Sequence, residues 1–318
     1  MQHVTALRVK AAAAAREINI VRWRGGRASR NVIDRRGARG GPVYRTGGRR
    51  GGGAVRLGGA GGLGLIGIVL LGWFLGVDLT PILGGQGGYA YETGAGSAPL
   101  TAADEERGEF SAVVLGYTEE VWDDVFREQV GQPYAAPALV LFSGATNTAC
   151  GYGEAATGPF YCPGDDRLYL DTDFFVTLDR ELGASGDFAQ AYVIAHEVGH
   201  HVQNLLGVLP QVSAAQARAG QAEANALQVR VELQADCYAG IWARGAEERI
   251  GVLEPGDIDE ALGAAARIGD DTLQREAGRA VRPETFTHGS SAQRARWFET
   301  GYRTGDLQAC DTFAARSL

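Results

Sequence analysis

Hydrophobic positions recur at intervals of three and four in several stretches of the chain, and this spacing predicts helices. The stretches are residues 113–130, 187–206, 258–268 and 292–302. Two short extended runs, 138–142 and 167–170, lie between the first two of them and predict a small sheet whose edge can receive an extended peptide. The expected fold is therefore an α+β domain over residues 109–318, mainly helical with a small sheet.

One uncharged run stands apart from this domain. Residues 57–77 contain no charged side chain and are bracketed by Arg56 and Asp78. As a helix they would be about 30 Å long, the thickness of the hydrocarbon core of a bilayer. The run predicts one transmembrane helix, preceded by a basic, Gly/Arg-rich segment over residues 1–56 and followed by a Gly-rich linker over 78–108.

Charge is divided unevenly on the two sides of that run. Residues 1–56 carry 14 Arg and Lys against Glu17 and Asp34, while the whole chain has a net charge of −8. Basic residues on one flank of a transmembrane helix indicate the cytoplasmic side, so we expect the N-terminus inside and the domain outside the inner membrane. The strongly acidic remainder argues against nucleic-acid binding by the domain. Residues 22–56 are also typical of an RGG-type RNA-binding tail, but arginines beside a membrane are explained more simply by anionic lipid.

The four cysteines, Cys150, Cys162, Cys237 and Cys310, all follow the apolar run. An even number in a compartment that the topology makes oxidising favours disulfides, and no C-x-x-C spacing indicates a zinc thiolate site. Three pairings are possible. The favoured one joins Cys150 to Cys162 and Cys237 to Cys310.

The strongest chemical signal is His196-Glu197-x-x-His200, within the predicted helix 187–206, for which Ser185 and Asp187 are candidate caps. Residues at i and i+4 share one face of a helix, so both imidazoles can bind one Zn²⁺. Glu197 would then act as general base on a zinc-bound water. His201 points about 100° away from His200 around the helix and is expected to have a structural role.

A catalytic zinc site needs a third protein ligand, and Glu232 is the candidate. Asp236 follows it at i+4 and can accept the second ring N–H of a ligand histidine, His196 being the expected one. The alternative interpretation is a pair of solvated acidic residues on a helix surface.

These segments resemble the gluzincin arrangement of zinc peptidases and, more closely, the YpfJ-like neutral zinc metallopeptidases. The resemblance covers most of residues 22–313 and is carried by the segments 22–24, 29–37, 158–163, 191–204, 232–237 and 286–294. It implies a zincin-like fold, zinc dependence and a membrane anchor. Such proteins begin near Arg22-Trp-Arg24, which predicts that residues 1–20 are a mis-annotated extension and that Val21 is the true initiator.

The resemblance also concerns His288 and Arg294, which look like the H-x-x-x-x-x-R segment of related gluzincins. Hydrolysis of an amide develops negative charge on the carbonyl oxygen, and His288 is the predicted hydrogen-bond donor to it. Tyr192 and Tyr238 are lesser candidates for the same role, and the alternative for His288 is a loop residue without function.

The leading hypothesis is a membrane-anchored zinc metallopeptidase that hydrolyses peptide bonds of extracytoplasmic proteins or peptides. The alternatives are a catalytically silent, zinc-stabilised membrane scaffold or binding protein, and an RNA-tethering membrane protein. Substrate preference and oligomeric state have no signature in the sequence.

Overall fold

The computed structural model describes residues 21–37, 99–154, 158–184 and 186–318 of the chain. Its helices are α3 Ala102–Val125, α4 Phe174–Arg180, α5 Asp187–Leu205, α6 Val208–Gln216, α7 Gln221–Gly245, α8 Asp257–Arg267, α9 Asp270–Glu276 and α10 Ser291–Thr304. Short π-helical turns, Phe126–Val130 and Ala246–Ile250, extend α3 and α7, and 3-10 turns cover Pro283–Thr285 and Leu307–Cys310. The mainly helical α+β class is confirmed.

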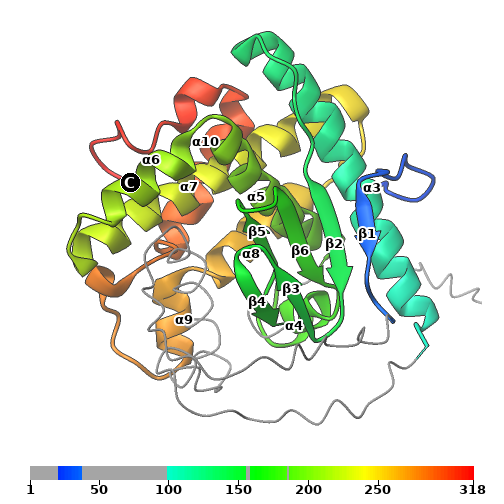
Figure 1. Ribbon diagram of the computed structural model, residues 1–318, viewed down its shortest axis with the longest axis horizontal. Helices are drawn as coiled ribbons and strands as arrows, with labels where there is room; N and C mark the ends of the chain where they lie inside the picture. Colours follow the sequence, from blue (N-terminus) through cyan, green and yellow to red (C-terminus); the bar gives the residue numbers. More distant parts are fainter. Residues whose placement is uncertain (1–20, 38–98, 155–157, 185) are drawn as a thin grey trace, which may run out of the picture.

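Four strands form the main sheet in the order β1-β2-β6-β5, with β1 Val32–Asp34, β2 Ala138–Phe142, β6 Arg167–Asp171 and β5 Phe160–Cys162. The first three strands are parallel and β5 is antiparallel to β6. A separate hairpin pairs β3 Ala145–Thr148 with β4 Gly151–Glu154. Both predicted extended runs are therefore strands of one sheet. Figure 1 shows β1 beside α3 at one edge of this sheet and β5 at the other.

Residues 21–37, here called the N-terminal arm, pack on the domain. Val21 and Trp23 are buried in the main hydrophobic core, where the Trp23 ring meets Phe110 of α3 edge to face at 5.6 Å. The Ser29 amide donates to the Ala112 carbonyl at 2.8 Å, and β1 supplies the edge strand. The charge pattern predicts a separate basic segment over residues 1–56, and a strand of three residues leaves almost no periodic signal that would show otherwise.

Helix α3 begins earlier than predicted, inside the stretch expected to be linker up to residue 108. Thr101 and Asp104 form a capping box at its start, which satisfies free backbone N–H groups. Gly108 then lies under the guanidinium group of Arg36, where any side chain would collide. The glycine is thus a packing feature of the helix and no sign of a linker.

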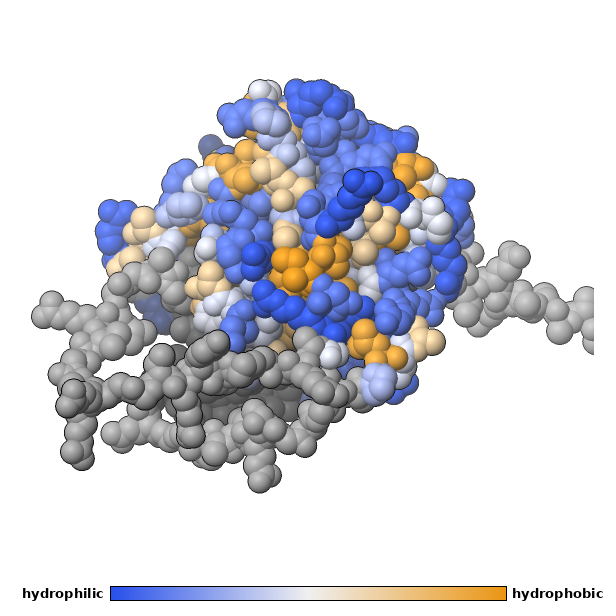
Figure 2. Space-filling view, turned by 45° about the vertical axis from the view of Figure 1, so that its right-hand side comes forward, coloured by the Kyte–Doolittle hydropathy of each residue, from blue (hydrophilic) through white to orange (hydrophobic). Residues whose placement is uncertain are grey.

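The core contains helices α3, α5, α7, α8 and α10, and α7 makes its most extensive contacts with α10 and α5. Two disulfides, Cys150–Cys162 and Cys237–Cys310, join the predicted pairs. On the face drawn in Figure 2, hydrophilic residues predominate and apolar ones gather only in small areas. Within the described residues, none of the helices is both long and apolar enough for a bilayer span. The predicted transmembrane run 57–77 lies outside those residues.

Candidate metal centre

The HExxH helix α5 and the Glu232 helix α7 pack closely against each other at a glycine, Gly199. A Cβ on Gly199 would lie 2.9 Å from the carbonyl oxygen of Ala235 and 3.1 Å from its Cα, tighter than an ordinary contact. Only glycine allows the two backbones to come this close. The close approach brings Glu232, one turn before Ala235, against the face of α5 that carries His196 and His200.

Three predicted ligands converge at this crossing. One ligand atom each from His196, His200 and Glu232 lies within 4.8 Å of the others. The Nε2 atom of His196 is 3.2 Å from Oε2 of Glu232, and the Nε2 atom of His200 is 3.7 Å from the same oxygen. Two imidazole nitrogens and one carboxylate form the donor set of catalytic zinc sites of the His₂Glu type.

The second nitrogen of each imidazole is held by a polar partner. Nδ1 of His196 contacts Oδ1 of Asp236 at 2.8 Å, as predicted, and Nδ1 of His200 contacts Oε1 of Gln203 at 2.9 Å. An acceptor on Nδ1 fixes the ring tautomer and leaves the Nε2 lone pair for a metal. Both Nε2 atoms therefore face Glu232 in the form needed for ligation.

Asp236 is itself held by two groups that are fully buried with it. The guanidinium group of Arg294 donates to both its carboxylate oxygens, at 2.8 and 2.9 Å, and the hydroxyl of Tyr192 donates to Oδ1 at 2.5 Å. This charge pairing and these hydrogen bonds, with His196 adding to both, outweigh burial and hold the pKa of Asp236 at about 2. Tyr192 is thus occupied in support of Asp236, and the weaker suggestion that it acts on substrate is not supported.

Three glutamines that sequence reasoning missed complete the support. Gln203 donates through Nε2 to Val231 O at 2.8 Å and to Gln234 Oε1 at 3.0 Å, which turns its own Oε1 toward His200. Gln228 donates to Oε1 of Glu232 at 2.8 Å. For Gln203 and Gln228, the spacing from the ligands, at i+3 from His200 and i−4 from Glu232 on the same helices, was the available signal.

The charges at the site favour a cation. Burial lowers the pKa of His196, but the Asp236 carboxylate and hydrogen bonds to Asp236 and Glu232 outweigh it and raise that pKa to about 9. Burial raises the pKa of Glu232, but the two imidazoles hold it well below its usual range. Without a metal, His196 and Glu232 therefore share a tightly bound proton at the position that a metal ion would occupy. The residues present therefore fit a zinc ion.

Glu197 lies on the same helix, between the two histidines. Burial raises the pKa of its carboxyl group, although the neighbouring imidazoles and the amide N–H of Tyr161 oppose the shift. The contact with Tyr161 brings strand β5 next to the predicted general base. A raised pKa makes this carboxylate a stronger proton acceptor, which suits a general base beside a metal site.

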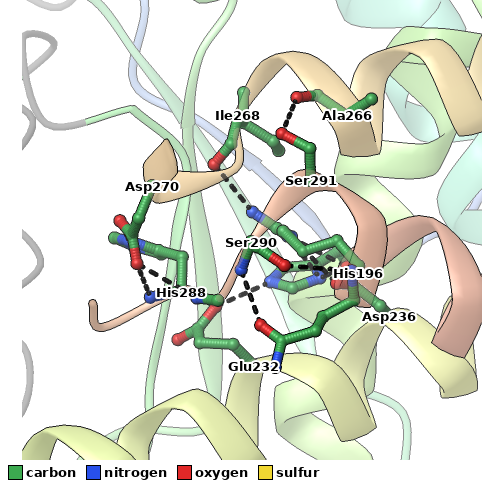
Figure 3. Close-up of polar contacts among 12 residues, drawn as sticks. His196, Glu232, Asp236, Ala266, Ile268, Asp270, His288, Ser290 and Ser291 are labelled. Atoms are coloured by element: carbon green, nitrogen blue, oxygen red, sulfur yellow. Dashed lines mark hydrogen bonds and ion pairs between the residues drawn. The ribbon is translucent and has the colours of Figure 1, made fainter. Parts of the chain in front are cut away.

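His288 approaches the same site from the loop before α10. Figure 3 shows its side chain between Asp270 and Glu232. Asp270 accepts from the amides of residues 287, 288 and 289 at 2.7, 2.7 and 3.0 Å, and its Oδ1 is 3.2 Å from Nδ1 of His288. Burial lowers the pKa of His288, but the charge of Asp270 outweighs it and raises that pKa. Asp270 was not predicted, because it lies 18 residues earlier on a separate short helix.

His201 does not reach the site. Its ring nitrogens contact Ala135 O at 2.6 Å and the hydroxyl of Tyr161 at 3.2 Å, so it links α5 to the sheet side of the domain. The predicted structural role fits this arrangement. Tyr238, the other tyrosine considered, packs edge to face on Trp122 in the core.

The His-His-Glu site, largely buried and next to a glutamate on two crossing helices, could hold a metal ion. Residues 21–313 match the family model described as "Putative neutral zinc metallopeptidase". The chain belongs to this zinc metallopeptidase family. The resemblance stated from the sequence is thereby confirmed.

Relatives in two bacteria show how far the similarity extends. The chain is 47% identical over 293 residues to the protein YpfJ of Escherichia coli (strain K12), which covers 92% of this chain and 99% of that protein. It is 52% identical over 195 residues to the protein Rv2575 of Mycobacterium tuberculosis (strain H37Rv), covering 58% of this chain and 65% of that protein. No solved structure matches the chain.

Proposed function

We propose that the protein is a zinc-dependent metallopeptidase that hydrolyses peptide bonds of proteins or peptides. The observation that carries the proposal is the convergence of both Nε2 atoms on Glu232, with Glu197 beside them and Asp236 behind His196. His196, His200 and Glu232 would hold the zinc. When bound, zinc polarises the scissile carbonyl group and makes water more acidic.

The side chains of this chain then carry the proton transfers. Glu197 takes a proton from the attacking water and delivers it to the nitrogen of the leaving amine. His288 donates a hydrogen bond to the carbonyl oxygen as negative charge grows there, and Asp270 keeps its imidazole oriented. The Asp236 carboxylate, paired with Arg294, keeps His196 in the ligating tautomer.

The sheet supports a peptide as substrate. Strand β5 is an edge strand of the main sheet, and its residue Tyr161 contacts Glu197. An extended peptide can add to a sheet edge through main-chain hydrogen bonds. Binding there would bring a substrate amide next to the general base.

The test is cleavage of a denatured protein by the purified, zinc-loaded full-length chain and by its Glu197→Gln variant. We expect Glu197→Gln to lower kcat by about 10²–10⁴-fold with zinc content unchanged, because general-base catalysis is lost and the ligands remain. Glu223→Gln, at an exposed position in the first turn of α7, is the matched control and should keep full activity. Equal cleavage by Glu197→Gln would refute the mechanism, and bound zinc without cleavage by the wild type would favour the scaffold alternative.

For the location, we propose attachment to a membrane through residues 57–77, with the peptidase domain outside the cytoplasm. Both disulfides support an oxidising compartment. Pairing of β1 with β2 and packing of Trp23 on Phe110 favour a position of the arm on the same side of the membrane as the domain. A chain that crossed the membrane once between residues 38 and 98 would separate them, so the expected topology with only the N-terminus inside and the contacts of the arm make opposite predictions for the side on which the arm lies.

Labelling of single cysteines tests this topology in intact cells. All four native cysteines are in disulfides, so Ala28→Cys in the arm and Arg218→Cys in the domain, both exposed positions, provide unique thiols. We expect a membrane-impermeant maleimide to label both positions without detergent. Labelling of only one of them would show that a membrane lies between the arm and the domain.

A further inference from the structure

Three carboxylates gather where the HExxH helix begins. Asp187 is the first residue of α5, and Asp257 and Glu260 lie in the first turn of α8. One oxygen from each lies within 4.8 Å of the others. Nine residues of helix, about 13 Å, separate Asp187 from His196, so the cluster is distinct from the metal centre.

In the described part of the chain, the three carboxylates lack some of the hydrogen-bond donors and all of the cationic side-chain partners that such groups normally have. Asp257 is fully buried, and its Oδ1 atom has no hydrogen-bond partner, whereas Oδ2 accepts from the Glu254 amide at 2.9 Å. Both oxygens of Asp187 are buried without a hydrogen bond of regular geometry. Glu260 accepts from the Phe188 amide at 3.2 Å. No ion pair links any of the three to a basic side chain in the described part of the chain, although buried carboxylates normally have a cationic or hydrogen-bonding partner.

The start of the arm lies against the same cluster. Val21 is only 3% exposed, and the Arg22 amide donates to Val252 O at 2.9 Å. The guanidinium group of Arg22 is 3.8 Å from Glu254, the residue whose amide binds Asp257. The backbone nitrogen of Val21 is close enough to Asp187 for its N–H to lower the pKa of that carboxyl group. The main-chain nitrogen of Val21 therefore lies near one of the unpaired carboxylates, that of Asp187.

We infer that the cation held by Asp187, Asp257 and Glu260 is the α-ammonium group of residue 21, at the N-terminus of the functional chain. An ammonium group offers three N–H donors, whereas the amide of an internal residue offers one and carries no charge. A divalent cation is the other possible occupant, but it would have to share the space with the nitrogen of residue 21. The family match also begins at this residue.

This site would couple the chain start to the metal helix. Gly186, at the N-cap position of α5, has no side chain, and Glu260 from α8 accepts from the Phe188 amide instead. The ammonium group would neutralise this capping carboxylate and its two neighbours. Translation that starts at residue 21 would put methionine there, which is apolar like the buried Val21. A longer chain would keep an uncharged amide in the same place.

The composition of the chain makes the test specific. Lys10 is the only lysine, so a chain that begins at residue 21 has a single primary amine, its own N-terminus. The protein is produced from its native gene with a C-terminal tag and purified with zinc. Intact mass spectrometry gives the first residue of the chain. Reaction with an amine-acylating N-hydroxysuccinimide ester then measures how accessible the amine is. We expect a mass that begins at residue 21 and an amine that reacts at least about tenfold more slowly in the folded than in the unfolded protein.

Variants separate the ammonium from other occupants. Asp187→Asn should make the amine of the folded protein reactive, while Asp179→Asn, at an exposed position in α4, should leave it protected. A chain that begins at residue 1, a blocked N-terminus, or an amine that reacts equally fast folded and unfolded would overturn the inference. Thermal stabilisation by added Ca²⁺ that is lost in Asp257→Asn, together with a reactive amine, would assign the cluster to a metal and also overturn it.

Discussion

Helix α5 contacts two groups of carboxylates, one buried and one partly buried, and these groups differ in how their charge is balanced. At the metal centre, Asp236 is paired with the buried guanidinium group of Arg294 and with His196. At the beginning of the helix, Asp187, Asp257 and Glu260 have no such partner within the described residues. The first group is balanced by side chains alone, whereas the second is the group for which we infer a cation from elsewhere. Unbalanced carboxylates can thus point to a binding site for a further group.

Removing the cation from the balanced group should have the largest effect. Arg294→Met leaves the Asp236 carboxylate buried without its main charge partner, which typically costs about 3–5 kcal/mol of unfolding free energy. We expect zinc affinity to fall by about 10–100-fold as well, since His196 loses its support. Urea unfolding and zinc titration measure the two effects. Arg303→Met, which removes an exposed pair with Glu299, should cost about 1 kcal/mol or less; equal losses would contradict the argument.

Moving helices α5 and α7 apart should have an intermediate effect on stability and zinc affinity. A methyl group on Gly199 would press on the Ala235 backbone, and overpacking of this kind costs about 1–3 kcal/mol. The contact between the two helices sets the distance from Glu232 to the histidines. Gly199→Ala should therefore reduce the free energy of zinc binding by more than it reduces the free energy of unfolding. Gly263→Ala, in open space on α8, is the control and should be neutral or slightly stabilising.

The unbalanced group should give the smallest effect, seen in the pH dependence of stability. With an amide at residue 21, burial raises the pKa of Asp187 to about 6 and that of Glu260 to about 7. A carboxyl group with a higher pKa in the folded state binds its proton more tightly there, so stability is greatest below the unfolded-state pKa and is lost as the pH rises through 6 to 7.

A chain extended before residue 21 should therefore melt lower at pH 8 than at pH 5, by on the order of a few degrees. A chain with an ammonium group at residue 21 should lose less, because an opposite charge lowers the pKa of the carboxyl groups. Differential scanning calorimetry of both chains, with Glu260→Gln as control, checks this. The same pH dependence in both would show that the ammonium group is not in the cluster.

The pairs of site residues on each metal-binding helix were predictable from the sequence because helical periodicity fixes which residues share a face. His196 and His200 lie one turn apart on α5, and Glu232 and Asp236 do so on α7, so each pair had to share a face. The capping box at Ser290, which starts α10, was equally local. Such features depend on neighbours within four residues.

What escaped prediction depends on contacts distant in the sequence. The start of α5 was expected to be capped by Ser185 or Asp187, but the structure has Gly186 at the N-cap and Glu260, 72 residues away, as acceptor of the Phe188 amide. Asp270 and the strand β1 were missed for the same reason. Their roles follow from which segments lie side by side, and spacing along the chain carries no record of this.

The edge strand β1 has a practical consequence for protein production. Without residues 21–37, strand β2 would present unpaired N–H and C=O groups along one side, and open edges of this kind promote aggregation. Trp23 would also be missing from its place against Phe110, leaving apolar surface in water. A protein expressed from a start after the apolar run should therefore aggregate. Joining residues 21–37 to residue 99 through a short polar linker should give a soluble, monodisperse catalytic domain.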